Sequence, residues 1–190
     1  MVKTRDRILE ATADLLRRKG YNGTGLKEIV KASEAPFGSI YHHFPGGKEE
    51  LGAEAIRVAG RTYNALIQAF FENATDAAAA TEAFFDGAGV VLEMTDYEDA
   101  CPIATVALEV ASTSEPMRVA SGEVFESWID DVVRDFESLG MDASLCRDVA
   151  VELLMLIEGA FLLCRSWKST EPMKIAGRRA VETVREALSD

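Results

Sequence analysis

The stretch TGLKEIVKASEAPFGSIYHHFPGGK, residues 24–48, decides the fold of the N-terminal part of the chain. In its first half, Leu26, Ile29 and Val30 recur at the spacing of one helical face, which predicts a short helix with an apolar side. Pro36 interrupts that pattern, because proline lacks a backbone N–H and fits only the first turn of a new helix. The sequence therefore predicts two short helices joined by a tight turn.

The second short helix is expected over residues 37–44. Ile40 and Phe44 lie four residues apart, so both can point into a core from one face. Most of the hydrogen-bonding side chains fall off that anchored face, and the set comprises Ser39, Tyr41, His42 and His43. This layout is typical of a helix-turn-helix unit, whose second helix enters the major groove of DNA.

The run GSIYHHFPGGKEEL, residues 38–51, resembles the signature of TetR-type transcriptional repressors, in which Gly-Ser/Thr-Leu-Tyr-x-x-Phe precedes Lys-Glu-x-Leu. The resemblance covers roughly the first quarter of the chain and matches residue identity, order and spacing together. It implies that the second helix faces DNA and that Lys48 contacts a phosphate. The residues expected at the DNA interface are Lys3, Thr24, Gly25, Pro36, Phe37, Gly38, Ser39, Tyr41, His42 and Lys48.

Three positions depart from the family pattern. Glu34 occupies a turn position that is normally glycine, so either Glu34 adopts a strained backbone or the turn has another geometry. Pro36 stands where a serine usually caps the second helix, and Gly25 stands where threonine or serine is a common cap of the first. These departures concern the local stability of the turn and the details of base contact.

Charge is distributed unevenly along a chain whose formal net charge is −12. Residues 1–48 carry nine Lys/Arg and five Asp/Glu, whereas residues 49–190 carry eleven and 27. The basic end would attract a phosphate backbone that the acidic remainder repels.

No apolar run has the length of a membrane span and no secretory signal is visible, so a cytoplasmic protein without membrane contact is expected. Cys101, Cys146 and Cys164 lack C-x-x-C spacing, which favours reduced thiols.

Helical periodicity continues to the end of the chain, without a β pattern of useful length. Further helices are expected over residues 3–19, 48–71, 77–94, 102–111, 115–139, 144–167 and 171–188. Oxygen-bearing side chains are expected to cap three of them, at Asp76, Ser114 and Thr170. The sequence thus predicts an all-α fold of about nine helices. Residues 1–47 would form a helix-turn-helix DNA-binding domain, and residues 48–190 a helical ligand-binding and dimerisation domain.

The run CPIATVALEV, residues 101–110, resembles the branch of TetR-type regulators near the lincomycin-resistance regulators of Gram-positive bacteria. Some members of that branch respond to aromatic natural products. The family resemblance implies that the C-terminal domain dimerises through its last two long helices and holds an inducer pocket. We therefore expect a ligand-responsive repressor whose homodimer binds a near-palindromic operator and is released by a small aromatic or apolar molecule.

The residues of the C-terminal domain permit both dimerisation and ligand binding. The helix over residues 144–167 is apolar nearly all round, so one bundle core cannot use all of its faces. The residues expected in a dimer interface are Met155, Gly159, Leu162, Leu163, Ala176, Ala180 and Val184.

Apolar walls with a few polar groups are typical of small-ligand sites. The residues expected to line such a site are Phe84, Phe85, Ala88, Val91, Cys101, Thr105, Phe125, Trp128, Ile129, Leu156, Phe161 and Trp167. Trp128 is the foremost of these, because a buried indole needs a partner for its N–H. Thr105, Glu109 and Glu158 supply polar groups that could orient a ligand.

Other interpretations are weaker or stay open. The chain lacks a nucleophile–base set and a phosphate-binding loop, and His42 and His43 lack the spacing of metal ligands, so neither an enzyme nor a metal or cofactor is expected. A helical adaptor that binds protein is an alternative, against which the basic N-terminal end speaks. A regulator that acts without a ligand, or as an activator, is compatible with the sequence.

Overall fold

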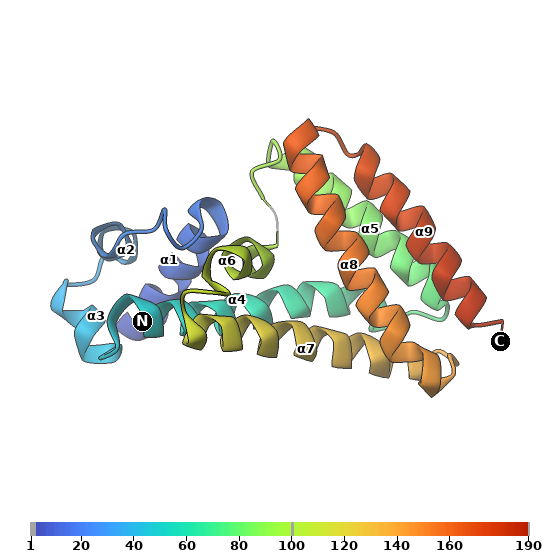
Figure 1. The fold of residues 1–190 in the computed structure, drawn as a ribbon, viewed down its shortest axis with the longest axis horizontal. Coiled ribbons are helices and arrows are strands. Elements are labelled where there is room, and N and C mark those ends of the chain that lie inside the picture. The colour runs from blue at the N-terminus through green and yellow to red at the C-terminus, as the bar shows by residue number, and fades with distance from the viewer. Residues whose placement is uncertain (1–2, 100, 190) are drawn as a thin grey trace. The chain divides into compact units, whose positions relative to one another are not determined.

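The computed structural model describes residues 3–99 and 101–189, and over these ranges the chain forms nine α-helices and no strand (Figure 1). The helices are α1 (Thr4–Lys19), α2 (Leu26–Ser33), α3 (Gly38–His43), α4 (Gly47–Phe71), α5 (Ala77–Met94), α6 (Pro102–Val110), α7 (Glu115–Ser138), α8 (Ala143–Trp167) and α9 (Glu171–Ala187). The predicted all-α fold is confirmed, and the long helices begin and end within one residue of their expected ranges.

The chain divides into two compact units. The first contains Met1–Tyr63 and Cys101–Phe125, and the second contains Asn64–Ala100 and Glu126–Asp190. Helices α4 and α7 each begin in the first unit and end in the second. The predicted functional division after residue 47 is a different partition of the chain, and it stays a prediction.

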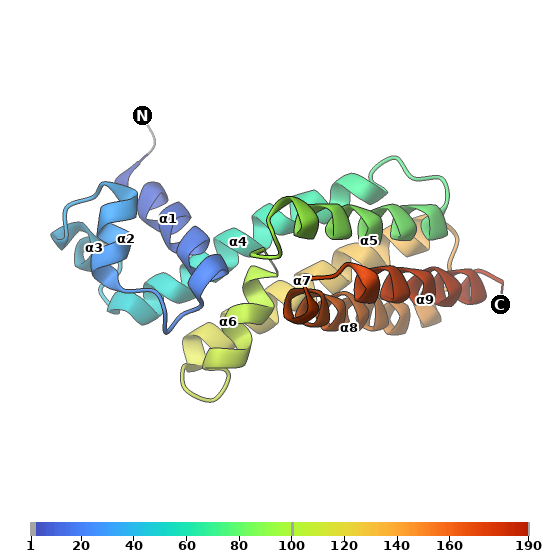
Figure 2. The same ribbon diagram turned by 90° about the horizontal axis from the view of Figure 1, so that it is seen from above.

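The first unit packs α1, α2 and α3 around a small apolar core (Figure 2). Ile8 and Leu16 of α1 and Ile29 of α2 are buried there, as the periodicity of both helices predicts. Ile40 and Phe44 are also fully buried. The six residues of α3 are too few for a stable isolated helix, so these two anchors hold it in place and keep its other face outward.

Within the first unit, two glycines of α4 allow α7 to approach closely. A Cβ at Gly60 would lie 2.6 Å from the Val124 side chain, and a Cβ at Gly52 would lie 2.9 Å from that of Met117. The order of these contacts along both helices shows that α4 and α7 run in the same direction, as in Figure 1.

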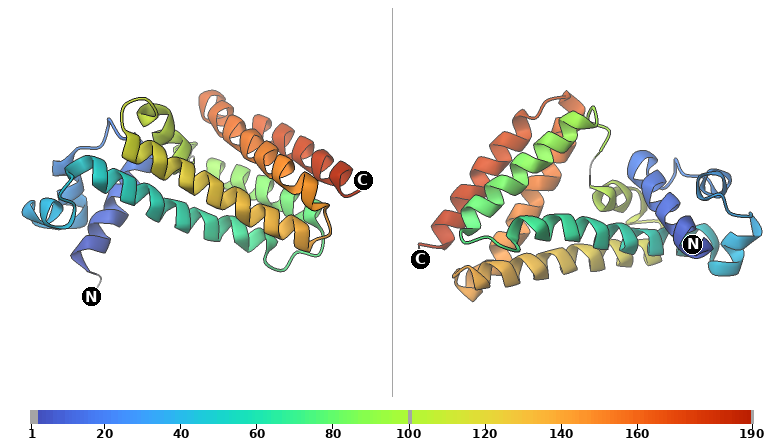
Figure 3. Two further views of the ribbon diagram at one scale, coloured as in Figure 1. Left: turned by 60° about the horizontal axis from the view of Figure 1, so that its bottom comes forward. Right: turned by 180° about the vertical axis from the view of Figure 1, so that it is seen from behind.

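In the second unit α5, α8 and α9 lie side by side (Figures 1 and 3). A Cβ at Gly177 of α9 would lie 3.0 Å from the Phe85 side chain of α5, so glycine permits close packing. Ala180 and Val184 continue that face of α9 and are fully buried. Leu153 of α8 belongs to the same core. The small-residue face of the last helix is therefore covered by its own chain.

Of the three predicted N-terminal helix caps, one is confirmed. Asp76 accepts hydrogen bonds from the backbone N–H groups two and three residues later, at 2.8 and 3.1 Å, and so caps α5. Ser114 is a correction, because its buried Oγ has no hydrogen-bond partner among the described residues. Thr170 is a second correction, because its hydroxyl donates to Glu93 at 3.0 Å and does not cap α9.

Candidate nucleic-acid interface

The turn between α2 and α3 is made without glycine. Glu34 has φ 51° and ψ 34°, the left-handed conformation that favours glycine. Its carbonyl oxygen accepts a hydrogen bond from the Arg7 guanidinium at 3.5 Å, which ties the turn to α1. The N–H of Ala35 donates to the Val30 carbonyl at 3.3 Å. Of the two geometries open at this position, the structure therefore has the strained backbone, held by its neighbours.

The outward face of α3 carries aromatic and hydrogen-bonding side chains. Phe37 is 47% exposed and Tyr41 is 51% exposed, and their ring centroids lie 6.1 Å apart, one helical turn from each other. His42 is exposed as well, and its ring meets that of His43 edge-on with centroids 4.8 Å apart. The three residues on which the DNA-binding prediction chiefly rests therefore share one solvent-facing surface.

The remaining expected contact residues differ in exposure. Lys3, Gly25, Pro36 and Gly38 are exposed, and Ser39 is half-buried. Both α2 and α3 begin without a side-chain cap, as expected from the residues at their N-termini.

Thr24 is a correction to the expected interface. Its side chain is fully buried, and its hydroxyl donates to the Gly20 carbonyl at 2.7 Å. Because that hydrogen bond closes the loop between α1 and α2, the side chain supports the loop and does not reach the surface.

Lys48 has two contacts with Tyr21. Its Nζ donates to the Tyr21 carbonyl oxygen at 2.7 Å and lies 4.0 Å from the centroid of the Tyr21 ring. Burial lowers the pKa of Lys48, and the nearby Glu109 carboxylate opposes that effect. In this structure Lys48 ties the start of α4 to the loop that leads into α2. The phosphate contact expected from the family pattern stays a prediction.

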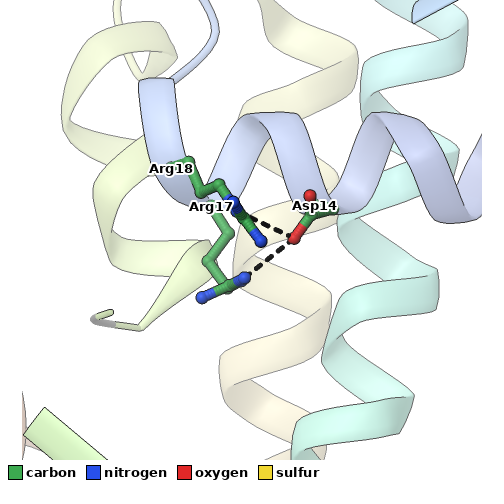
Figure 4. Close-up of polar contacts among 3 residues, drawn as sticks. All are labelled: Asp14, Arg17 and Arg18. Atoms are coloured by element: carbon green, nitrogen blue, oxygen red, sulfur yellow. Dashed lines mark hydrogen bonds and ion pairs between the residues drawn. The ribbon is translucent and has the colours of Figure 1, made fainter. Parts of the chain in front are cut away.

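Arg17 and Arg18, near the end of α1, both approach the same carboxylate of Asp14 (Figure 4). Oδ1 of Asp14 lies 2.8 Å from Nη2 of Arg17 and 3.2 Å from Nε of Arg18. Burial raises the pKa of the Tyr63 hydroxyl, and a hydrogen bond from Arg17 opposes this. Arg17 thus lies near Tyr63 of α4 within the first unit, and its side chain is only 17% exposed.

The other cations of this region divide into paired and exposed side chains. Arg5 forms an ion pair with a glutamate of α4, and Lys19 forms one with a glutamate of α2. Lys3, Lys27 and Lys31 are exposed and have no ion pair within the described part of the chain. Lys27 and Lys31 lie four residues apart on α2. The sequence alone does not single them out, because a lysine on a solvated helix face carries no distinctive signal.

The residues expected to line a ligand site do not form one group. In the second unit, Phe85, Trp128 and Ile129 are buried, and Phe84, Ala88, Leu156 and Phe161 are half-buried. Cys101, Thr105 and Phe125 belong to the first unit. Val91 and Trp167 are corrections, because at 50% and 60% exposure they face solvent on the single chain.

Two polar groups expected near a ligand are engaged elsewhere. Thr105 donates its hydroxyl hydrogen bond to the Cys101 carbonyl at 2.9 Å. Glu109 accepts a hydrogen bond from the backbone N–H of Asn22 at 2.9 Å. The carboxylate of Glu109 is therefore directed at the loop between α1 and α2, and the expectation that it orients a ligand is corrected.

The residues expected in a dimer interface fall into two sets. On α8, Met155, Leu162 and Leu163 are 64%, 63% and 41% exposed, and Gly159 between them is exposed too. On α9 the placement differs from the expectation, because Ala176, Ala180 and Val184 are buried in the core of the second unit. The apolar surface left uncovered on α9 includes Ile175, which is 46% exposed.

Other kinds of site have little support in the described part of the chain. Within it, no group of three or more His, Cys, Asp or Glu side chains could hold a metal ion, and no helix has the length and apolarity to cross a membrane. A surface depression of about 360 Å³ in the first unit is lined by Glu49, Glu50 and Glu54 together with Arg57. Three carboxylates would repel phosphate, so the outward face of α3 remains the candidate interface.

Two parts of the chain match families of known proteins. Residues 8–55 match the family described as bacterial regulatory proteins, tetR family. Residues 77–179 match the C-terminal domain of transcriptional regulators described as LmrA/YxaF-like.

Two similar proteins come from Bacillus subtilis (strain 168). The HTH-type transcriptional regulator LmrA is 33% identical over 170 residues, which is 90% of each chain. The uncharacterized HTH-type transcriptional regulator YxaF is 32% identical over 183 residues, or 96% of each chain. These likenesses confirm the branch that the run over residues 101–110 indicates.

A solved structure supports the fold independently. The TetR transcriptional regulator from Legionella pneumophila aligns with a TM-score of 0.80 at 24% identity, over 96% of this chain and 98% of that one. It shares the all-helical architecture. The match of both parts of the sequence, together with the nearly full-length relatives, establishes that the chain belongs to the TetR family of DNA-binding transcriptional regulators, with a C-terminal domain of the LmrA/YxaF-like kind.

Proposed function

We propose that this regulator is a repressor that binds a near-palindromic operator as a homodimer and leaves it when a small apolar molecule binds the second unit. The observation that carries the proposal is that α3 is buried on one side and exposed on the other. Ile40 and Phe44 are fully buried, whereas Phe37 and Tyr41 are about half exposed. A short helix fixed on one side and open on the other is suited to lie in a major groove.

Phosphate contacts in this proposal come from the exposed cations near α3. Lys27 and Lys31 stand on the exposed side of α2, and Lys3 precedes α1. Contacts of this kind fix the position of a protein on the duplex and make its affinity depend on salt. Lys48 takes a supporting role, because its Nζ is hydrogen-bonded to the Tyr21 carbonyl.

The exposed apolar face of α8 supports the proposed homodimer. Met155 and Leu162 lie seven residues apart, on one side of α8, and are each more than 60% exposed. Large apolar side chains gathered on one helix are typical of an interface, because leaving them in water is unfavourable. A two-fold dimer would have to place its two α3 helices about 34–36 Å apart to reach successive major grooves.

The half-buried apolar side chains of the second unit indicate what class of ligand it would bind. The ring centroid of Phe84 lies 5.8 Å from that of Phe70 and 5.6 Å from that of Phe85. Leu156 and Phe161 are half-buried against the same core. Walls of this chemistry favour an apolar or aromatic molecule. Such a ligand releases DNA only if it binds the DNA-free state more tightly, which shifts the population of the two states.

Selection from a random DNA duplex library, followed by fluorescence anisotropy at rising salt, tests the proposal. The wild-type protein should enrich a two-fold symmetric sequence and lose affinity steeply with salt. Tyr41→Ala should abolish binding. Lys31→Ala should make the salt slope shallower by about one per protomer. Lys174→Ala is the matched control, because it removes an exposed cation of α9 in the second unit.

Two outcomes would overturn the proposal. A library from which no duplex is enriched would exclude sequence-specific DNA binding by the protein. Binding of Tyr41→Ala with wild-type affinity would place the recognition surface elsewhere.

A further inference from the structure

The outward face of α3 lacks the side chains that most often read bases by paired hydrogen bonds. Residues 36–45, all within the described part of the chain, contain no Arg, Lys, Asn or Gln. Arginine and lysine pair with the two acceptors of guanine, and asparagine and glutamine pair with adenine. Any direct readout by this helix therefore depends on its aromatic rings, one serine hydroxyl and its histidines.

Phe37 is the apolar group that this face holds outward. It directly precedes α3 and has the helical backbone angles φ −54° and ψ −40°, so it stands at the N-terminal end of the helix. In helix-turn-helix proteins that end contacts the base edges. Its ring is 47% exposed, which leaves apolar area in water until a partner covers it.

Tyr41 keeps the Phe37 ring in this position. The two rings lie 6.1 Å apart at an angle of 54°, a tilted arrangement that is favourable for aromatic pairs. Ile40, between them in sequence, is fully buried and fixes the rotation of the helix. The Phe37 ring is thus supported on one side and uncovered on the other.

We propose, on the basis of the DNA binding proposed above, that Phe37 makes this regulator specific for thymine by contacting the C5-methyl group of one thymine in each operator half-site. Thymine is the base that presents a methyl group in the major groove, and phenylalanine is one of the side chains that contact it. Ser39 and His42 supply hydrogen bonds to neighbouring base edges. Tyr41 keeps its own place at the DNA interface proposed above, and in addition it positions the Phe37 ring.

The contact has a measurable size. Replacing thymine by deoxyuridine removes the methyl group and leaves every hydrogen-bonding group unchanged. Removing one methyl group from water is worth about 0.8 kcal/mol, or about a fourfold change in Kd. Symmetric replacement in both half-sites should therefore weaken binding by about fifteenfold.

The experiment uses the duplex enriched from the random library as its probe. Each thymine position is replaced by deoxyuridine in both half-sites, and Kd is measured by anisotropy at one salt concentration. The wild-type protein should show one position with a loss of about fifteenfold. Phe37→Ala should bind the thymine and deoxyuridine duplexes equally. Tyr41→Phe, which keeps the supporting ring, should retain the preference for the methylated duplex whatever affinity it loses.

The outcomes separate this inference from the proposed function. If a duplex is enriched but no thymine position responds to loss of its methyl group, the inference is wrong and DNA binding stands. The same holds if Phe37→Ala keeps the wild-type preference, because another residue then reads the methyl group. If no duplex is enriched, the proposed function fails and the thymine contact fails with it. An exposed side chain leaves the core intact when truncated, and circular dichroism of Phe37→Ala verifies its fold.

Discussion

The carboxylate of Glu109 in α6 accepts a hydrogen bond from the backbone N–H of Asn22, in the loop between α1 and α2, at 2.9 Å. The same side chain lies against Gly20, which has φ +68°. In the same loop, the Tyr21 carbonyl accepts a hydrogen bond from Lys48 of α4 at 2.7 Å. Two helices of the first unit therefore hold the segment that leads into α2, and its position depends on both.

Removing the Glu109 carboxylate should weaken this support. Glu109→Ala loses the acceptor of the Asn22 N–H, and because the site is open to water we expect a loss of about 1 kcal/mol in the free energy of unfolding. Glu109→Gln keeps an acceptor oxygen and should lose less. Urea unfolding of both variants measures the difference. Equal losses would show that the negative charge near Lys48 matters, and not the hydrogen bond.

The same contact marks a limit of sequence reasoning. Asn22 and Glu109 are separated by 87 positions, and helical periodicity carries no information about a partner at that distance. Ile40 and Phe44 were predictable because both their spacing and their burial are properties of one helix. The partner of Lys48 within the chain is not predictable in this way, since the family pattern gives the residue but not the Tyr21 carbonyl that holds its amine.

Two helical glycines of the first unit should respond to alanine in opposite directions. At Gly60 a Cβ would lie 2.6 Å from the Val124 side chain, so Gly60→Ala overpacks the contact between α4 and α7 and should cost about 1–3 kcal/mol. At Gly122 no atom lies within 4 Å of the added Cβ, so Gly122→Ala should stabilise by up to about 1 kcal/mol. Thermal unfolding compares the two variants. A rise in Tm for both would mean that α4 and α7 are farther apart than described.

Asp135 of α7 should make stability depend on pH. Burial raises the pKa of its carboxyl above the ordinary value of 3.8, and the hydrogen bond from Gln68 at 3.0 Å opposes this. The folded state then retains the proton at higher pH than the unfolded state does, so stability is lost as pH rises through the raised pKa. Asp135→Asn removes that titration and keeps an acceptor for Gln68. The variant should be more stable than the wild type at pH 7.

Urea unfolding of the wild type and Asp135→Asn across a pH series tests this assignment. The stability difference should shrink as pH falls towards 3.8 and below. Gln68→Ala provides a control of opposite sign, because it removes the donor that favours the charged carboxylate and should destabilise more at pH 7 than in acid. A difference that is constant with pH would rule out Asp135 as its source.

The face of the last helix shows why interface residues are hard to assign from sequence. Ala176, Ala180 and Val184 repeat every four residues, and such a stripe suits either a dimer contact or packing within one chain. The structure buries it within the chain, beside Phe85 of α5. On α8 apolar residues occur on all sides of the helix. Which of them stay exposed depends on the helices that pack against α8, and the sequence of α8 does not give these.

If the proposed homodimer forms through α8, Leu162→Glu should separate it. The side chain is 63% exposed on the single chain, so a charge there leaves the protomer folded but would be buried without a partner in the interface. Leu108→Glu is the matched control, since Leu108 is 84% exposed on α6. Sedimentation velocity should give monomers for the first variant and dimers for the second.

A substitution in the core distinguishes the exposed side of α8 from the buried small-residue side of α9 as the dimer interface. Ala180→Leu adds volume to a fully buried position, so it should lower Tm by overpacking without favouring folded monomers. Operator affinity should fall steeply for Leu162→Glu, because a monomer reaches only one half-site. If Leu162→Glu stays dimeric while Ala180→Leu yields folded monomers, the interface runs along the small residues of α9. In that case the second unit must open α9 away from α5 on assembly, since those residues are covered in the single chain.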